Sequence, residues 1–583
     1  RRATLEQRLE DGVLRIVVPA EFLQHATLPL VVDPIVSTLS IAGSTRRQVD
    51  VDIAFCDPTT NYQIVYSELA SATDQDVFSV FYSESVDALL LPVAIDITST
   101  SWATPSNASA YHAEAFLCAA VTGNSIGSRR VRGRVVDGTT AARTPAFDIS
   151  GVGAETVDVG GKGNDIISAF DFMVVWQEVD GLSLDMDIVA QAVDAGGTLT
   201  AGRIVVDGDP SRLDRKPKIS KSTGRPTASN ANSQYMVVWE REVSPTDHNI
   251  RCQVMDYTGN LSGYPQFAGY TFSDALEPDV STPNTLVASF IYERHWLVTF
   301  ERRTGSDYDI FAVVAEDDSA FGAKNLTAMQ DVDVQLDQRN PRVAFSEFEY
   351  YITYETERAN GDRTVELLVA NTLDGGPELR TGVSLRRETL GTYAAGESRS
   401  AIATPYDGGD GITFNGQPRA LFAAPVRATP ADDSDIAGGL LDGPFASTTA
   451  SQYCEAASHS GGKSAWLRAR RQVAIGETEL RCFDLPANQF GIFLIAADAA
   501  FVPNPGGSDG NLCLGGAIGR YSTSAQIFGT GPDGVASLDT DDDVVPIPTG
   551  FVSITLNETW RYQAWFRDVG GTSNFSNAVQ QTY

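Results

Sequence analysis

One pattern of apolar and polar positions returns along the chain at intervals of about 50 to 60 residues. In residues 172–194 the apolar run FMVVWQEV is followed by a polar turn, then by the letters DMD and a second apolar run. The same order returns in residues 235–256 and 296–316, and weaker copies lie in residues 63–82 and 351–370. Two apolar runs joined by a short polar turn predict a β-hairpin, so the chain repeats one hairpin.

The hairpins belong to larger units, which can be separated at Gly, Pro, Asn and Asp. Each unit opens with a short strand such as residues 216–219, continues with the hairpin, and closes with a fourth strand such as residues 203–206. Four strands per repeat of this size are typical of a β-propeller. The predicted units span residues 43–100, 101–150, 151–206, 207–273, 274–327, 328–388 and 389–445.

The seventh unit supplies only three predicted strands, in residues 400–404, 419–424 and 435–441. Residues 34–40, at the other end of the chain, form a further predicted strand. A ring of sheets must pair its first and last members or leave strand edges open, and an N-terminal strand in the last blade closes it. We therefore predict a seven-bladed propeller closed by an N-terminal strand, with six or eight blades as the alternatives.

The pattern divides the chain into three parts. Residues 1–32 are predicted to be an extended segment, either the remnant of a preceding domain or a junction, and residues 12–18 form a strand that could be donated to a neighbouring sheet. Residues 33–445 form the propeller. Residues 446–583 lose the repeat, gain glycine-rich turns, and predict an antiparallel β-sandwich. The predicted fold class is all-β throughout.

The charge of the chain excludes several partners. Its 583 residues carry 43 Lys and Arg against 75 Asp and Glu, which gives a net charge of −32 and a pI near 4.4. Such a surface repels nucleic acid and anionic membranes. No apolar run is long enough to span a bilayer, so we predict no membrane insertion. An acidic surface suited to salty water explains this composition, and calcium binding is the alternative.

Aspartates two positions apart open the second strand of most hairpins. Their side chains accept hydrogen bonds from nearby backbone amides and so fix tight turns. The alternative is a calcium site built with backbone carbonyls, and a dense acidic run in the tail offers the same chemistry. We predict no other cofactor. The candidate metal ligands are Asp185, Asp187, Asp307, Asp309, Asp539, Asp541 and Asp543.

An aromatic residue and a glutamate end the first strand of most hairpins. The repeated aromatic predicts packing between blades, with sugar stacking as the alternative. The repeated glutamate predicts a structural role, with a glycosidase carboxylate pair on the central face as the alternative. The aromatics are Tyr66, Trp176, Trp239, Phe300 and Tyr354, and the glutamates are Glu178, Glu240, Glu301 and Glu355.

Other catalytic signatures are missing from the sequence. The five histidines have neither the HExxH spacing nor another helical i, i+4 spacing, so a zinc site or a His-based triad is unsupported. The string GNSIG at residues 123–127 matches a nucleophile elbow, but it falls in a predicted hairpin loop instead of a strand-to-helix turn. We predict no catalytic residues.

Two passages carry a resemblance to a known group of proteins. Residues 18–34, VPAEFLQHATLPLVVDP, resemble a "YPL-x-IDP" junction, and residues 485–521 resemble a Cys- and Gly-rich C-terminal domain. Both occur in large secreted repeat proteins of environmental bacteria. The resemblance implies secretion and a β-sandwich tail of unassigned function. Cysteines 454, 482 and 513 alone allow three pairings, and the resemblance favours a disulfide between Cys454 and Cys513.

These observations predict a secreted, non-enzymatic structural or adhesive protein at the cell surface or outside the cell. A self-assembling filament or surface-layer subunit is the sharper version, with the chain itself, other surface proteins or polysaccharide as partners. The alternative is a polysaccharide-active or carbohydrate-binding propeller with acidic residues on its central face. Calcium-dependent ligand binding is the third hypothesis.

Overall fold

The structure is a computed structural model of the whole chain, and it forms two compact units, Arg1–Ile35 and Val36–Tyr583, which are described separately. The described residues are 6–10, 13–17, 36–84, 86, 88–125, 127–163, 170–179, 185–210, 212–221, 234–256, 259–262, 266–267, 274–282, 284–285, 294–304, 307–316, 324–328, 337–346, 349–357, 362–371, 386–394, 400–404, 419–426, 434–442, 451–454, 456–461, 464–472, 477–483, 485–531, 534, 536–555 and 558–583.

The first unit contains a β-hairpin. Strand β1 (Glu6–Glu10) pairs antiparallel with β2 (Val13–Val17), with Leu9 opposite Leu14. The sequence predicted a single strand over residues 12–18 that was free to join a neighbouring sheet. In the structure this strand pairs with β1 along one edge, and its donation to a neighbouring sheet remains a prediction.

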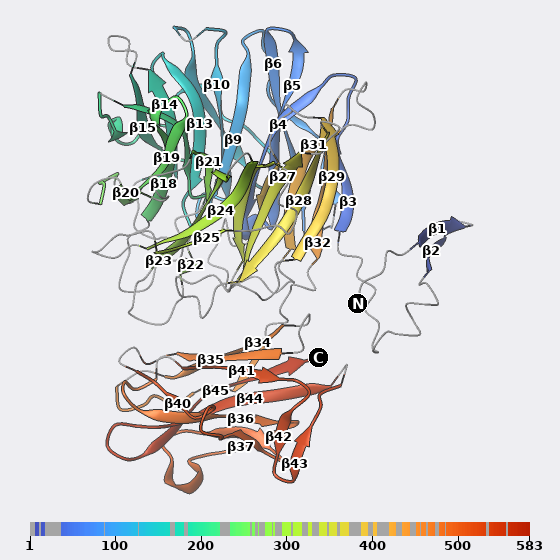
Figure 1. Ribbon diagram of the computed structural model, residues 1–583, viewed down its shortest axis with the longest axis vertical. Helices are drawn as coiled ribbons and strands as arrows, with labels where there is room; N and C mark the ends of the chain where they lie inside the picture. The colour runs from blue at the N-terminus through green and yellow to red at the C-terminus, as the bar shows by residue number, and fades with distance from the viewer. Residues whose placement is uncertain are drawn as a thin grey trace. The chain divides into compact units, whose positions relative to one another are not determined.

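The second unit contains a series of repeated antiparallel sheets (Figure 1). The first contains β4 (Gln48–Cys56), β5 (Asn61–Ser71), β6 (Asp74–Ser83), β7 (Ala88–Leu89) and β8 (Val93–Asp96), with a 3₁₀ turn, η1, at Asp57–Thr59. The second contains β9 (Trp102–Ala110), β10 (Ala115–Thr122), β11 (Arg130–Asp137) and β12 (Phe147–Asp148). An eight-stranded sheet follows, with β13 (Ala154–Gly161), β14 (Phe172–Val179), β15 (Met186–Val193), β16 (Ile204–Asp207), β17 (Leu213–Ile219), β18 (Gln234–Ser244), β19 (Asp247–Asp256) and β20 (Gln266–Phe267).

Three more sheets complete the repeats. One contains β21 (Ala275–Val280), β22 (Asn284–Thr285), β23 (Arg294–Thr304), β24 (Asp307–Glu316) and β25 (Lys324–Ala328). The next contains β26 (Gln338–Ser346), β27 (Glu349–Glu357), β28 (Asp362–Asn371) and β29 (Arg386–Ala394). The last contains β3 (Val36–Ala42), β32 (Asp435–Asp442), β31 (Arg419–Val426) and β30 (Ala401–Ala403), in that order across the sheet.

The first strands of these sheets lie side by side in a ring. Contacts run from β4 through β9, β13, β17, β21 and β26 to β30, and β30 contacts β4. We call them the inner strands. The eight-stranded sheet joins two such groups where Met186 of β15 pairs with Leu213 of β17. An antiparallel all-β fold of sheets standing around an axis is a β-propeller.

The N-terminal strand joins the last sheet. Strand β3 pairs antiparallel with β32, with Val36 opposite Leu441 and Ser40 opposite Ala437. This pairing is the one predicted from the seventh unit, which lacked a strand. The strand itself begins and ends two residues later than the predicted range of 34–40. The number of seven blades and the closure of the propeller by this N-terminal strand remain predictions.

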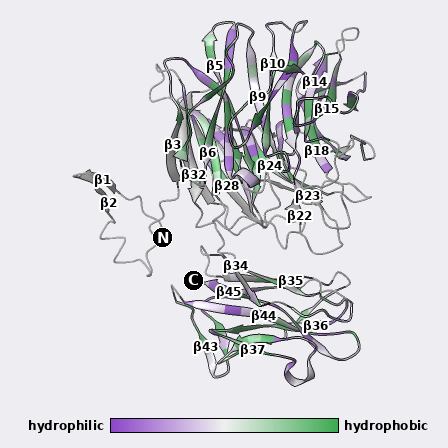
Figure 2. Cartoon of the chain, turned by 180° about the vertical axis from the view of Figure 1, so that it is seen from behind, coloured by the Kyte–Doolittle hydropathy of each residue, from purple (hydrophilic) through white to green (hydrophobic). Residues whose placement is uncertain are grey.

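Aromatic residues fill the spaces between neighbouring sheets. Trp176 of β14 is buried in a cluster with Leu117 and Val131 of the preceding sheet. Tyr66, Trp239, Phe300 and Tyr354 occupy the same position in their own clusters. The predicted packing between blades is therefore confirmed. Figure 2 shows the hydropathy of the residues along these strands.

The last part of the chain is a β-sandwich. One sheet has the order β33 (Ser451–Cys454), β45 (Ser573–Thr582), β44 (Thr559–Arg567), β36 (Phe490–Ala496) and β39 (Gly519–Tyr521), with β40 (Phe528–Gly529) beside β36. The other has the order β34 (Trp466–Gln472), β35 (Glu477–Phe483) and β41 (Ala536–Asp541). Their facing side chains form one core, in which Leu480 and Cys482 of the second sheet join Phe493 and Tyr562 of the first.

Two short hairpins accompany the sandwich. Strand β37 (Asp498–Val502) pairs with β38 (Leu512–Gly515), with the 3₁₀ turn η3 (Pro505–Gly507) between them, and β42 (Val545–Ile547) pairs with β43 (Gly550–Val552). A disulfide joins Cys454 to Cys513, the pair that the resemblance favoured, with their Cα atoms 6.4 Å apart. In the described residues, no helix has the length and apolarity needed to cross a membrane.

A candidate binding pocket on the inner strands

Most inner strands are interrupted by the same irregularity. The pairing register of β17 shifts between Arg215 and Lys218, and that of β21 shifts between Leu276 and Asp279. Such a shift is a β-bulge, which redirects side chains and is common beside functional sites. The same shift occurs in β4, β9, β13 and β26.

The first bulged residue usually has a left-handed backbone. Its φ is 50° at Lys216, 49° at Glu277 and 51° at Asn340, and Pro217, Pro278 and Pro341 come next. Proline lacks a backbone N–H and is tolerated in a sheet chiefly at edges and bulges, so the bulge gives it a place in an inner strand. Asp50 and Thr104 have the same conformation in β4 and β9.

The side chain that follows the repeated aromatic supports the bulge of the next sheet in three cases. Glu240 accepts a hydrogen bond from the N–H of Glu277 at 2.6 Å, and Glu301 accepts one from the N–H of Asn340 at 3.1 Å. Gln177 accepts the equivalent bond from the N–H of Lys216 at 3.2 Å. The glutamates therefore have a structural role between blades, as the sequence predicted.

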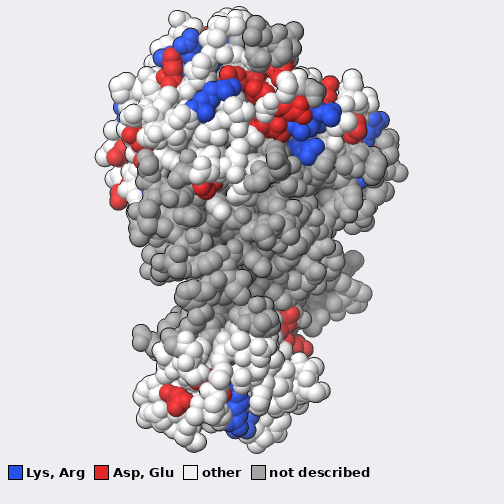
Figure 3. All heavy atoms as spheres, turned by 90° about the vertical axis from the view of Figure 1, so that its left-hand side faces the viewer, with Lys and Arg blue, Asp and Glu red and all other residues white. Residues whose placement is uncertain are grey.

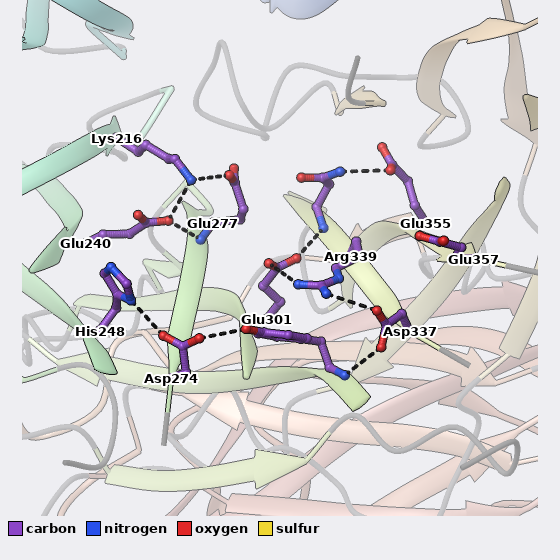
Figure 4. A network of polar contacts seen from close by, with 12 residues as sticks. Lys216, Glu240, His248, Asp274, Glu277, Glu301, Asp337, Arg339, Glu355 and Glu357 are labelled. Carbon is purple, nitrogen blue, oxygen red and sulfur yellow. Dashed lines mark hydrogen bonds and ion pairs between the residues drawn. The ribbon is translucent and has the colours of Figure 1, made fainter. Parts of the chain in front are cut away.

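Glu178 and Glu355 are bound differently. Glu178, which the sequence aligned with Glu240, lies one position further along and accepts from the indole of Trp176 at 3.0 Å. Glu355 accepts from Asn340 Nδ2 at 2.8 Å and from Arg363 at 2.7 Å. Figure 4 shows the glutamates of this network, with Lys216 between Glu240 and Glu277.

Two of these carboxyls are perturbed by their surroundings. Burial raises the pKa of Glu301 to about 7, against the opposing charge of Arg339, whose guanidinium lies 3.0 Å away, and the negative charge of Glu277 adds to the rise. Burial likewise raises the pKa of Glu240, and the positive charge of Lys216 opposes this rise without cancelling it. Neither glutamate lines the pocket described next.

The bulges line a pocket of about 190 Å³. Its walls come from inner strands β4, β9, β13, β17 and β26, and they contain charged, hydroxyl and small apolar side chains but no aromatic residue and no histidine. The lining residues are Asp50, Val51, Asp52, Thr104, Pro105, Ser106, Thr156, Val157, Lys216, Pro217, Lys218 and Arg342. On the face drawn in Figure 3, acidic and basic side chains also lie next to one another on the surface of the propeller.

A buried ion cluster adjoins the pocket through Asp52 and Ser106. Lys221 Nζ lies 2.6 Å from Asp52 Oδ2 and 3.3 Å from Asp158 Oδ1, and it also donates to Ser106 Oγ at 3.1 Å. Lys218 Nζ lies 3.2 Å from the same oxygen of Asp158. The cluster thus connects β4, β9, β13 and β17.

The carboxyl of Asp158 remains ionised in this cluster. Burial alone would raise its pKa, but the ammonium groups of Lys218 and Lys221 and the N–H of Ile219, 2.9 Å away, hold the pKa of Asp158 well below its usual range. Conversely, Asp158 and Asp52 raise the pKa of Lys221 despite its burial. Both partners are therefore charged at neutral pH.

Arg342 has fewer polar partners than the lysines of the pocket. Only 8% of it is exposed, and its Nη1 donates to the carbonyl of Pro341 at 2.6 Å. Its Nη2 has no hydrogen-bond partner, and neither does Thr156 Oγ1 on the lining. These two polar atoms are the unsatisfied donors of the pocket wall within the described part of the chain.

The predicted calcium ligands do not converge. Asp185 and Asp187 open β15, whereas Asp307 and Asp309 belong to β24 in another sheet. In the tail, Asp541 accepts from the N–H of Asp543 at 2.8 Å, a turn contact, and Asp539 pairs with Glu479 in the strand ladder. Among the described side chains, no group of three or more His, Cys, Asp or Glu is placed to hold a metal ion. Calcium binding remains a prediction.

The structure also contains a histidine–aspartate pair that the sequence did not reveal. His248 Nδ1 lies 2.7 Å from Asp274 Oδ1, and the hydroxyl of Tyr308 donates to Asp274 Oδ2 at 2.6 Å (Figure 4). The guanidinium of Arg339 lies 3.5 Å from the centre of the Tyr308 ring. His248 lies in β19, Asp274 directly precedes β21, and Tyr308 lies in β24, so no local spacing along the chain predicts the pair. Its contacts connect neighbouring sheets.

The chain aligns with several solved structures. A protein of unknown function from Dyadobacter fermentans aligns at 9% identity over 70% of this chain and 99% of its own, with a TM-score of 0.38. An ulvan lyase, described as a new polysaccharide lyase family, aligns at 11% identity over 70% of this chain and 96% of its own, with a TM-score of 0.40. The β-propeller domain of the Trilobed protease from Pyrococcus furiosus aligns at 8% identity over 68% of this chain and 96% of its own, with a TM-score of 0.34. Similarities at this level carry no argument about the pocket. No protein-family model matches the chain, and no curated protein sequence matches it.

Proposed function

We propose that the chain is an extracellular carbohydrate-binding protein whose inner-strand pocket binds one sugar unit of a polysaccharide without cleaving it. The observation that carries the proposal is the lining, in which hydroxyl and charged side chains sit on bulged strands that neighbouring sheets hold in place. A sugar offers many hydroxyl donors and acceptors, and a wall of fixed polar groups matches that chemistry. The extracellular location rests on the resemblance alone.

The size of the pocket suits a single unit of a polymer. Its volume of about 190 Å³ is below the roughly 300–1,000 Å³ of pockets that enclose a drug-sized ligand. Polar walls without aromatic platforms give modest affinity for one sugar, so adhesion to a polymer with many equivalent units would depend on repeated contacts.

The carboxylates of the pocket favour binding over cleavage. Most glycosidases use a pair of carboxyl groups, one of them protonated. Asp50 and Asp52 line this pocket, but Asp52 accepts hydrogen bonds from Lys221 at 2.6 Å and from the N–H of Asn107 at 3.0 Å. A carboxylate held by these two donors is poorly placed to act as a nucleophile or acid.

The filament and surface-layer role predicted from the sequence receives no comparable support. Its structural argument was a free N-terminal strand, and β2 pairs with β1 of the same chain. Adhesion to polysaccharide, which the sequence also predicted, agrees with the pocket.

The proposal is tested by affinity electrophoresis of the full chain in gels that contain different neutral and acidic polysaccharides. We expect retardation by at least one polysaccharide, with no increase in reducing ends after incubation. Thr156→Trp places a large side chain in the pocket wall and should weaken binding roughly tenfold or more. Its control is Thr73→Trp, in an exposed turn, which should bind like the wild type.

Three outcomes would overturn the proposal: no polysaccharide retards the protein, T156W binds as well as T73W, or sugar fragments appear. The melting temperature of both variants establishes that each is folded before binding is compared.

A further inference from the structure

Arg342 is a buried cation that forms no ion pair with any described residue. It is nine-tenths buried, its Nη1 bonds to a neutral backbone carbonyl, and its Nη2 has no partner. Buried charges in proteins are almost always paired, because an unpaired charge loses the solvation that water gave it. The guanidinium therefore lacks the ion pair that its burial calls for.

The other cations of the pocket wall are already paired. Lys218 Nζ lies 3.2 Å from Asp158, and Lys216 Nζ lies 3.2 Å from Glu240 and 2.5 Å from Glu277. Among the lining cations that the structure describes, Arg342 alone makes no ion pair. A new negative charge in the pocket would find its strongest unsatisfied attraction there.

A buried carboxyl, Asp279, lies close enough to Arg342 to feel its charge. Burial raises the pKa of Asp279, and the charges of Arg342 and Lys218 oppose that rise. Asp279 accepts a hydrogen bond from the N–H of Val343 at 2.8 Å, and no ion pair joins it to Arg342 among the described residues.

The pocket wall contains more cations than carboxylates, but its lysines are already paired. Lys216, Lys218 and Arg342 line the pocket beside Asp50 and Asp52. Carboxylates outside the lining balance Lys216 and Lys218, and Asp52 is paired with Lys221 at 2.6 Å. Arg342 is therefore the one cation of the described lining that forms no ion pair.

We infer that the sugar unit bound in the pocket carries a carboxylate, as a uronic acid does, and that the guanidinium of Arg342 binds this carboxylate. The inference rests on the proposed function and names its ligand class. A planar guanidinium matches the geometry of a carboxylate and forms strong charge-assisted hydrogen bonds with it.

The experiment compares three polymers by isothermal titration with the full chain: polygalacturonate, the same polymer with its carboxyl groups reduced to alcohols, and a sulfated galactan. Polygalacturonate should bind on the order of tenfold or more tightly than its reduced form, since a charge-assisted hydrogen bond is lost. Arg342→Gln should remove this preference. The control, Arg212→Gln, changes an arginine whose side chain is 44% exposed, and should keep it.

A second measurement avoids any folding defect of R342Q. Free galacturonate should compete for the pocket of the unaltered protein, whereas free galactose should compete far less. Equal binding of the acidic and reduced polymers, or preference for the sulfated one, would refute the carboxylate and leave carbohydrate binding intact. Failure of all polymers would instead refute the proposed function.

Discussion

Two buried carboxyls of the propeller, Asp158 and Glu301, have the same task and opposite protonation behaviour. Each accepts a backbone N–H from the next inner strand, Ile219 at 2.9 Å and Asn340 at 3.1 Å, and each lies beside a basic side chain. Yet the pKa of Asp158 is held well below its usual range, whereas that of Glu301 rises to about 7.

The difference lies in the number of charges around each group. Asp158 contacts two ammonium groups, Lys218 and Lys221, and the hydroxyl of Ser106. Glu301 contacts one guanidinium, Arg339, and also experiences the negative charge of Glu277. Burial penalises both ions, and only the fuller set of donors outweighs it. The buried negative charge of Asp158 is therefore fully compensated by its neighbours, whereas that of Glu301 is not.

The largest loss of stability should come from removing the compensated carboxylate, Asp158. Asp158→Asn leaves Lys218 and Lys221 partly unpaired and should lower the free energy of unfolding by about 3–5 kcal/mol at pH 7, as for other broken buried ion pairs. Because the folded pKa of Asp158 is depressed, its contribution is present at neutral pH and is lost as pH falls below the unfolded value, near 4. Urea denaturation at pH 7 and pH 3.5 should show the difference between the proteins shrinking in acid. A difference of the same size at both pH values would contradict the account of Asp158.

The contribution of Glu301 to stability should change with pH in the opposite direction to that of Asp158. The pKa of Glu301 is raised, so its stabilising contribution is complete below about pH 4.5 and is lost as pH rises through about 7. Glu301→Gln removes this titration. Relative to the wild type, the free energy of unfolding of E301Q should therefore increase by about 2–3 kcal/mol between pH 5 and pH 8. Parallel pH profiles of the two proteins would disprove the assigned pKa.

The sequence supplied the repeat but not the balance of charges. Apolar runs such as 172–179 and 235–239 predict strands directly, because side chains on both faces of these strands are buried between sheets. The bulges were hidden, since Lys216-Pro217 also resembles an ordinary strand opening. The ion cluster joins Lys221 to Asp52, which lies 169 residues earlier, and no local pattern connects residues at that separation. Likewise, a buried arginine without an ion pair is recognisable only when its neighbours are known.

The sheet that carries Gln177 provides a natural control for this comparison. Gln177 occupies the position of Glu301 in its own sheet and accepts the N–H of Lys216 at 3.2 Å without a charge. Gln177→Ala should leave that N–H unsatisfied and lower the free energy of unfolding by about 1–2 kcal/mol. The loss should be the same from pH 5 to pH 8, because glutamine does not titrate. Glu178→Ala, one residue along on a more exposed side chain, should cost less than about 0.5–1 kcal/mol. If Q177A were no more destabilising than E178A, the side chain after the aromatic would not support the bulge, and the shared task of Gln177 and Glu301 would be refuted.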